Sequence, residues 1–349
     1  MTSEASTLAD YGWATFFATQ LSSSELDAAL PARVVAVHRD RVVVAAPSFE
    51  AAVAPVGDGE NAATVGDWLL VDAGTQRALR VLERRSVFKR RAAGTDARVQ
   101  LIAANVDTLV VVSSCNADFN VARLERYLAL ARDAQATPLV VLTKADLATD
   151  ANDDARRAAA LMPGLVVESL DARDHDAVRS ALAPWLARGQ TLALVGSSGV
   201  GKSTLTNTLA GTTLATQAIR DDDAKGRHTT THRALHRLPG GAWLIDTPGM
   251  RELQLTDVRA GIDEVFDDVA TLAQRCRFGD CRHETEPGCA IAAAIASGAL
   301  DAARVARWRK LVAEDAHNSA TLAQRRARDR AFGRMADRVM ADKRLRRDR

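Results

Sequence analysis

The sequence is poor in cysteine and in aromatic residues, and it has no long apolar run. Its 349 residues include four Cys and 4% aromatic residues, and so few cysteines exclude a disulfide scaffold. No apolar stretch approaches the roughly 20 residues of a membrane helix. The acidic N-terminus also lacks the basic-then-apolar pattern of a signal peptide. We expect a cytoplasmic protein without membrane contact, and we expect a monomer.

What is present is the composition of an ordinary globular protein. Hydrophobic residues make up 47% and charged residues 26% of the chain, which excludes a disordered protein. Its length predicts two or three domains, because a domain commonly holds about 100 to 200 residues. The net charge of +2 hides a basic tail, since residues 325–349 carry a net +7 and the remainder −5. This tail favours binding to a polyanion such as RNA over a merely solvated helix face.

The first quarter of the chain predicts a small β-barrel that follows an N-terminal arm. Residues 33–84 alternate short β-branched runs with turn signals, giving five strand-like segments. Five short strands in about 50 residues match the size of an OB-fold, although other small barrels fit nearly as well. The basic segment 84–91 reads as a linker. After Val106, strand and helix patterns alternate, with Asn120 as a candidate helix cap, which predicts a parallel sheet flanked by helices.

The sharpest motif is GSSGVGKS, which fits the phosphate-binding pattern GxxxxGK[ST] between a predicted strand and a predicted helix. Glycines let backbone N–H groups surround phosphates, and the helix start favours an anion. Lys202 is expected to reach the terminal phosphates and Ser203 to bind Mg²⁺. The predicted nucleotide contacts are Gly196, Ser197, Ser198, Gly199, Val200, Gly201, Lys202, Ser203 and Thr204.

A second motif, TKAD, selects the base. Thr143, Lys144 and Asp146 directly follow the predicted strand PLVVL. The Asp146 carboxylate can accept two hydrogen bonds from the N1–H and 2-amino groups of guanine, a pair that adenine does not present, while the Lys144 stem can cover the ring. On its own the tetrapeptide is equally an exposed charged loop. Together with the phosphate loop it predicts GTP and GDP as ligands.

Two further segments complete a GTPase pattern. Asp246 and Gly249 belong to DTPG after an apolar strand, a pattern that senses the γ-phosphate. The polar stretch GRHTTT offers Thr230 as the switch threonine that binds Mg²⁺, with Thr229 as the second choice. Ordinary GTPases have the base motif last, whereas here it comes first. The sequence therefore predicts a circularly permuted domain. Ser169 is a candidate for the remaining base contact, although Leu170 replaces the usual small residue after it.

Three of the four cysteines cluster with a histidine in the pattern C-x4-C-x-H-x5-C. Three thiolates and one imidazole form a closed tetrahedral zinc site, which predicts one structural Zn²⁺. The alternative is a group of buried cysteines beside an incidental histidine. The predicted ligands are Cys276, Cys281, His283 and Cys289.

The combination of barrel, TKAD, GSSGVGKS, GRHTT, DTPG and the zinc pattern resembles the RsgA family of small ribosomal subunit biogenesis GTPases. The likeness covers residues 8–316, including the YGW arm and the RWRKLVAE helix. It implies a multidomain protein with an OB-fold-like β-barrel, a circularly permuted α/β P-loop GTPase domain and an α-helical zinc-binding domain. The predicted limits are 1–30 for the arm, 31–85, 86–256 and 257–316 for the domains, and 317–349 for a basic extension.

The resemblance also implies a partner and a gap in the catalytic site. The partner is the small ribosomal subunit and its rRNA, with GTP hydrolysis stimulated by the subunit and coupled to late maturation. Met250 stands where Ras-like proteins carry a glutamine that orients water, and a thioether cannot do this. His228 is the internal candidate for that role, because an imidazole can position water at neutral pH; equally, it could pack against the phosphates.

Three rival interpretations remain at this stage. An ATPase or kinase would make TKAD a coincidence, and competition by GDP but not ADP excludes it. An RNA-binding scaffold would use GTP only to stabilise its fold. A permuted GTPase that acts on the large subunit would leave the zinc pattern without a reason.

Overall fold

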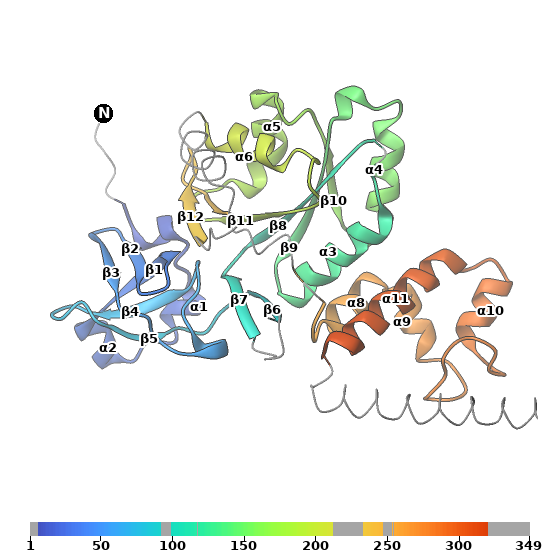
Figure 1. Ribbon diagram of the computed structural model, residues 1–349, viewed down its shortest axis with the longest axis horizontal. Coiled ribbons are helices and arrows are strands. Elements are labelled where there is room, and N and C mark those ends of the chain that lie inside the picture. Colours follow the sequence, from blue (N-terminus) through green and yellow to red (C-terminus); the bar gives the residue numbers. More distant parts are fainter. Residues whose placement is uncertain are drawn as a thin grey trace, which may run out of the picture.

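The computed structural model describes residues 6–91, 99–116, 118–211, 233–246, 253 and 255–319. The chain begins with antiparallel N-terminal strands. A central sheet flanked by helices comes next, and a group of helices forms the C-terminal part (Figure 1). Among the described helices, none has the length and apolar character needed to cross a membrane. Of the predicted extension, only residues 317–319 are described, and they end the last helix.

The N-terminal part contains all five predicted strands. The arm forms η1 (Leu8–Tyr11), α1 (Thr15–Ala18) and α2 (Ser23–Ala28), in which Ser22 and Glu25 build a capping box. The strands pair antiparallel in the order β3-β2-β1-β4-β5. They are β1 (Ala29–Val37), β2 (Val42–Ala46), β3 (Phe49–Val53), β4 (Trp68–Asp72) and β5 (Ala78–Val81), with η2 (Gly59–Asn61) between β3 and β4.

These strands curl around a core of their own. Val34, Val44 and Leu69 are fully buried in it, as expected from the β-branched alternation of the sequence. Within the described part, no pairing of β5 back onto β3 is recorded. Closure into an OB-fold therefore stays a prediction.

The central sheet has the order β10-β9-β8-β11-β13-β12. All neighbours pair parallel except β12, which is antiparallel to β13. The strands are β8 (Thr108–Ser114), β9 (Thr137–Thr143), β10 (Val166–Ser169), β11 (Thr191–Val195), β12 (Arg233–Arg237) and β13 (Trp243–Asp246). The predicted parallel sheet is thereby confirmed.

Helices cover both faces of this sheet. They are α3 (Val121–Asp133), α4 (Ala151–Ala159), α5 (His175–Leu182) and α6 (Lys202–Ala210), together with η3 (Ala145–Leu147) and η4 (Ala183–Trp185). Successive residues of β8 point to opposite faces, so Leu109 packs in the core with α3 and α4 while Val110 packs in the core with α5 and α6. Asn120 caps α3, its Oδ1 accepting from the Arg123 N–H at 3.0 Å, which confirms the predicted cap.

The prediction of a linker at residues 84–91 is wrong. Most of that segment is β6 (Val87–Arg91), which forms an antiparallel hairpin with β7 (Val99–Ala104). Phe88 is buried in the central core. Arg84 and Arg85 are paired with Asp67 and Asp107, respectively. Two of the positive charges that favoured a linker are therefore paired with carboxylates of the folded protein.

The C-terminal helices pack on α3 through α8 and α11. They are α8 (Arg259–Val265), α9 (Asp267–Ala273), α10 (Ala290–Ala296) and α11 (Ala302–Ser319), grouped at one end of the molecule (Figure 1). Glu125 of α3 is fully buried, and its carboxylate accepts from Arg307 at 2.7 Å and pairs with Arg304 at 3.4 Å. A Cβ on Gly261 of α8 would lie 2.1 Å from the Ala129 carbonyl oxygen, so glycine permits the close crossing of α8 and α3.

A buried arginine joins the arm, the barrel and the central sheet. Arg33 of β1 is 1% exposed. Its guanidinium donates to the Tyr11 carbonyl, to the Thr191 hydroxyl at 2.7 Å and to the Asn105 carbonyl at 3.2 Å. Because Thr191 begins β11, this junction lies at the amino end of the parallel strands.

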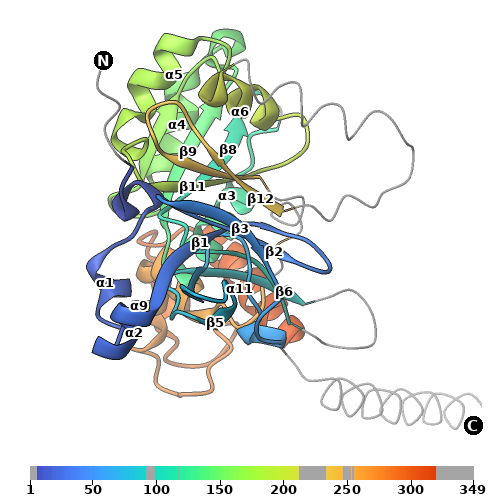
Figure 2. The same cartoon turned by 90° about the vertical axis from the view of Figure 1, so that its left-hand side faces the viewer.

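The two sheets are also joined by their backbones. β1 pairs antiparallel with β12, with Ala36 opposite Ala234 and Val37 opposite Arg233. Figure 2 shows β1 next to β12, where the N-terminal strands meet the central sheet. The N-terminal strands and the central domain thus share one eleven-stranded sheet.

We expect Asp133→Asn to stabilise the protein at neutral pH. Burial raises the pKa of Asp133 to about 6, Lys89 opposes this, and Asp315 and Asp257 add to it. A carboxyl whose pKa is raised in the folded state stabilises that state fully below pH ~4, where it is protonated. This stabilisation is lost as the pH rises through ~6 and the buried group becomes charged. The variant's advantage should therefore grow between these pH values and reach about 1–2 kcal/mol above them.

Urea unfolding of both proteins at pH 5.0 and 7.5 measures this advantage, because the difference between variant and wild type cancels pH effects that they share. Asp267→Asn, at an exposed position on α9, serves as the matched control. An advantage of the same size at both pH values would contradict the assignment.

Candidate functional site

The phosphate-binding motif forms a loop between β11 and α6, as its sequence predicts. Three of its glycines have positive φ: Gly196 at 143°, Gly199 at 82° and Gly201 at 90°. A Cβ on Gly196 would lie 2.2 Å from the Val112 carbonyl oxygen of β8. Glycine is therefore required at the point where the loop leaves the sheet.

Lys202 begins α6 and is folded over this loop. It is 9% exposed, and its ammonium donates to the Gly196 carbonyl at 2.8 Å and to the Ser197 carbonyl. Ser203 and Thr204 follow on the exposed side of the first turn. The loop therefore places one cation and two hydroxyls at a helix start, where the helix dipole favours anions.

The TKAD motif lies beside the phosphate loop. Thr143 ends β9 and is fully buried, and its hydroxyl donates to the Val200 carbonyl at 2.6 Å. Lys144 has a left-handed backbone (φ 57°), and its ammonium donates to the Gly199 carbonyl at 2.9 Å. Residues separated by more than fifty positions in the chain thus form one site at the carboxyl end of the parallel sheet, where ligands of open α/β sheets bind.

Asp146 lies in the short helix η3, directly after Lys144 and Ala145. Its Oδ2 accepts from a guanidinium N–H of Arg173 at 2.8 Å. Asp171 binds the same guanidinium. Sequence patterns do not predict Arg173, because a contact between two loops leaves no periodic pattern.

The segment after β10 connects the base motif and the phosphate loop. The Leu170 carbonyl accepts from the Ala145 N–H at 3.4 Å, and the Ala172 carbonyl accepts from the Thr208 hydroxyl of α6 at 2.7 Å. Leu170 is buried in place of the small residue expected there. Ser169 ends β10 next to this segment, and its role as a base contact stays a prediction.

Helix α3 contributes a contact that sequence reasoning missed. Arg123, in its first turn, donates to the Ser197 hydroxyl of the phosphate loop. Two residues further on, Glu125 binds the arginines of α11. The same helix therefore contacts both the phosphate loop and the C-terminal helices.

Several predicted site residues lie outside the described part of the chain. They are His228, Thr229, Thr230, Gly249 and Met250. The backbone of Asp246 is described and ends β13, next to β11. The roles predicted for these five residues and for the Asp246 side chain stay predictions.

The predicted zinc ligands come together. The ligand atoms of Cys276, Cys281, His283 and Cys289 all lie within 4.8 Å of one another. Cys276 Sγ is 3.4 Å from His283 Nδ1 and 4.0 Å from Cys289 Sγ. Tetrahedral zinc with ordinary bond lengths needs ligand separations of about 3.5 to 3.8 Å. The spacing and the donor set therefore fit one zinc ion.

The surroundings of the cluster hold its loop in place. Glu286 accepts from the N–H groups of Arg282, Glu284 and Thr285, and these bonds lower the pKa of Glu286 to about 2. Burial, with the positive charge of Arg309, lowers the pKa of His283. The imidazole is therefore neutral at pH 7, which is the form that binds a metal.

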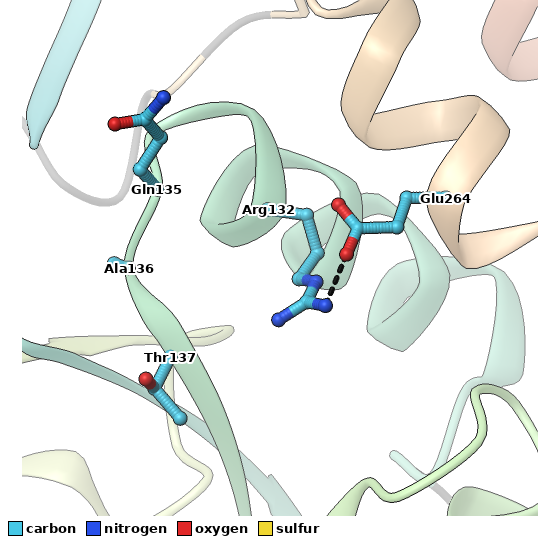
Figure 3. A pocket seen from close by; sticks show the side chains of 5 residues that line it. All are labelled: Arg132, Gln135, Ala136, Thr137 and Glu264. Atoms are coloured by element: carbon cyan, nitrogen blue, oxygen red, sulfur yellow. Dashed lines mark ion pairs between the residues drawn. The ribbon is translucent and has the colours of Figure 1, made fainter.

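A small cavity of about 240 Å³ lies elsewhere, at the amino end of β9. Arg132 and Glu264 form an ion pair in its wall, and Gln135, Ala136 and Thr137 complete the lining (Figure 3). Thr137 begins β9, whereas Thr143 ends it. The cavity is therefore at the edge of the sheet opposite the nucleotide motifs and is not part of their site.

Comparison with known proteins agrees with this geometry. The RsgA GTPase family model matches residues 81–256. "Small ribosomal subunit biogenesis GTPase RsgA 2" of Vibrio parahaemolyticus is 48% identical, with 97% of this chain and 94% of that protein covered. "Small ribosomal subunit biogenesis GTPase RsgA" of Mesorhizobium japonicum is 51% identical, with 91% and 93% covered.

Two solved structures show the same fold. They are YjeQ from Thermotoga maritima, which is 23% identical over 81% of this chain and 97% of that one, and YloQ, described as a circularly permuted GTPase, which is 22% identical over 84% and 97%. Each gives a TM-score of 0.59. The predicted permutation is thereby confirmed. This chain is a GTP hydrolase with a circularly permuted GTPase domain, and it belongs to the RsgA family.

Proposed function

We propose that this protein binds the small ribosomal subunit and couples GTP hydrolysis to its late maturation, with hydrolysis stimulated by the subunit. The observation that carries the proposal is the joining of Thr143 and Lys144 to the phosphate loop, which creates a site for a guanine nucleotide. The partner is supported by relatives that match nearly the whole chain and bear the name of small ribosomal subunit biogenesis GTPases.

The nucleotide roles that we propose follow the chemistry of each group. The loop from Gly196 to Gly201 surrounds the phosphates with N–H donors, and Lys202 neutralises their charge. Asp146 accepts from guanine, and Ser203 and Thr230 bind the Mg²⁺ that accompanies GTP. Such an ion neutralises charge that develops on the phosphates.

The hydrolytic step needs a group that orients water, and Met250 cannot supply it. We propose His228 for this role, positioned when the small subunit binds. Without the subunit, the phosphate clamp holds GTP but the chemistry is slow. Thr230, Asp246 and Gly249 complete the proposed γ-phosphate contacts.

The remaining parts of the proposal concern metal, RNA and location. Cys276, Cys281, His283 and Cys289 hold one structural Zn²⁺, which leaves no open coordination position for catalysis. The barrel (31–85), the zinc-binding domain (257–316) and the basic extension (317–349) bind rRNA, the arm (1–30) packs on the barrel, and residues 86–256 form the GTPase domain. The protein acts as a monomer in the cytoplasm.

Steady-state GTP hydrolysis with and without purified small subunits tests this function. We expect turnover to rise at least roughly tenfold with small subunits. Large subunits at the same concentration should give no such rise. A Lys202→Ala variant, measured in parallel, reports hydrolysis by contaminating enzymes. Equal turnover under all conditions would favour the RNA-binding scaffold, in which GTP only stabilises the fold.

A further inference from the structure

Asp146 is bound by a positively charged side chain of its own protein. Arg173 donates to its Oδ2 at 2.8 Å across a gap of 27 residues in the chain. The carboxylate proposed to read guanine is therefore bound by a cation from a different loop.

The position of Arg173 is fixed by a second carboxylate. Asp171 accepts from the Arg173 backbone N–H at 2.9 Å and from the guanidinium Nε at 2.9 Å and terminal nitrogen at 2.9 Å. The residue before Arg173 is held as well, because the Ala172 carbonyl accepts from the Thr208 hydroxyl of α6. The guanidinium is thus held next to Asp146, so little side-chain freedom is lost when the pair forms.

The donor groups of arginine and guanine are chemically alike. A guanidinium presents N–H donors on two nitrogens attached to one planar carbon, and guanine presents its N1–H and 2-amino group around one ring carbon in the same way. Both match a carboxylate, which accepts along two nearly parallel directions. In this structure the fork of Arg173 binds Asp171, and one terminal nitrogen of that fork also donates to Asp146 Oδ2. A carboxylate oxygen bound by Arg173 is therefore weakened as an acceptor for guanine.

We propose that Arg173 competes with guanine for Asp146 and thereby sets the affinity and release rate of the nucleotide. The proposal rests on the proposed role of Asp146 in reading the base. In this arrangement, Arg173 displaces the guanine edge as the nucleotide leaves, and the Arg173–Asp146 bond must break before the base is fully bound.

The exposure of the pair limits the size of the effect. The side chain of Arg173 is 68% exposed and that of Asp146 is 30% exposed. Ion pairs as exposed as this one are weak and are screened by salt. We therefore expect the competition to change nucleotide affinity roughly two- to fivefold.

The test is the affinity and dissociation rate of GDP and GTP for Arg173→Ala, measured on the full zinc-loaded chain. We expect binding roughly two- to fivefold tighter than wild type, mainly through slower dissociation, with the gain shrinking as salt rises. Arg173→Lys, which keeps the charge but loses the planar fork, should lie between the two. Arg156→Ala removes another exposed arginine, paired with Asp153 on α4, and should leave binding unchanged.

Each other outcome has a definite meaning. Weaker binding by Arg173→Ala would show that Arg173 contacts the nucleotide, and unchanged binding would show that the ion pair has no energetic role; either overturns the proposal. The base-reading role of Asp146 is tested separately by Asp146→Asn, which should lose GTP affinity and gain affinity for xanthosine triphosphate. If it does, the Arg173→Ala effect must also disappear in the double variant.

Discussion

Replacing Lys202 with alanine should lower GTP turnover about 10³-fold. Losses of up to this size follow when one preorganised hydrogen-bond donor that stabilises developing charge is removed from a reaction centre. The Lys202 ammonium lies at the start of α6, bound to the carbonyls of Gly196 and Ser197. It is the cation that the phosphate loop itself supplies to the terminal phosphates. Its loss corresponds to about 4 kcal/mol in the activation barrier.

A second lysine provides the matched control for this prediction. Lys144 also donates to a carbonyl of the loop, that of Gly199. Lys144→Ala therefore removes a comparable loop contact but leaves the phosphate cation in place. Turnover and nucleotide affinity should be measured for both variants with small subunits present. Equal losses in the two variants would mean that Lys202 only shapes the loop.

Replacing Cys281 with alanine should remove the zinc ion and unfold the loop that binds it. Four protein ligands form the site, and apparent zinc-binding free energies in small zinc peptides reach about 10–16 kcal/mol. We expect zinc content to fall from one per chain to almost none after dialysis. Elemental analysis measures the metal, and hydrogen exchange locates the region that loses protection.

The unfolding should stop short of the whole C-terminal region. α8 and α11 share a core with α3, and Arg307 of α11 binds the buried Glu125. We therefore expect protection to fall between Cys276 and α10, with GDP binding unchanged. Cys115→Ala is the control, because Cys115 is a buried cysteine that is not one of the four grouped ligands. Full zinc retention by Cys281→Ala would contradict the assignment.

Local patterns were sufficient to predict the five N-terminal strands, several strands of the central sheet and the motif positions. The apolar run before TKAD forms β9, and the glycines of the phosphate loop adopt the positive φ angles that only glycine accepts readily. The zinc ligands converge because their spacing already restricts a short loop. Each of these predictions depends on residues that are close in sequence, where steric and hydrogen-bonding preferences act directly.

Contacts between distant segments could not be predicted in this way. Arg173 and Asp146 lie on separate loops, and the pairing of β1 with β12 joins residues about 200 positions apart. The basic segment 84–91 was misread for the same reason. Arg84 and Arg85 have partners in Asp67 and Asp107, and these pairs form only once the chain has folded.

The pairing of β1 with β12 limits how the N-terminal strands can move relative to the nucleotide site. A swing of these strands as a separate body would break the backbone bonds around Ala36 and Ala234 and expose the buried Arg33 guanidinium. Each unpaired buried polar group costs about 1–3 kcal/mol. We therefore expect the N-terminal strands and the phosphate loop to move as one body during turnover, with little change in the distance between them. Any RNA that contacts both must fit that distance.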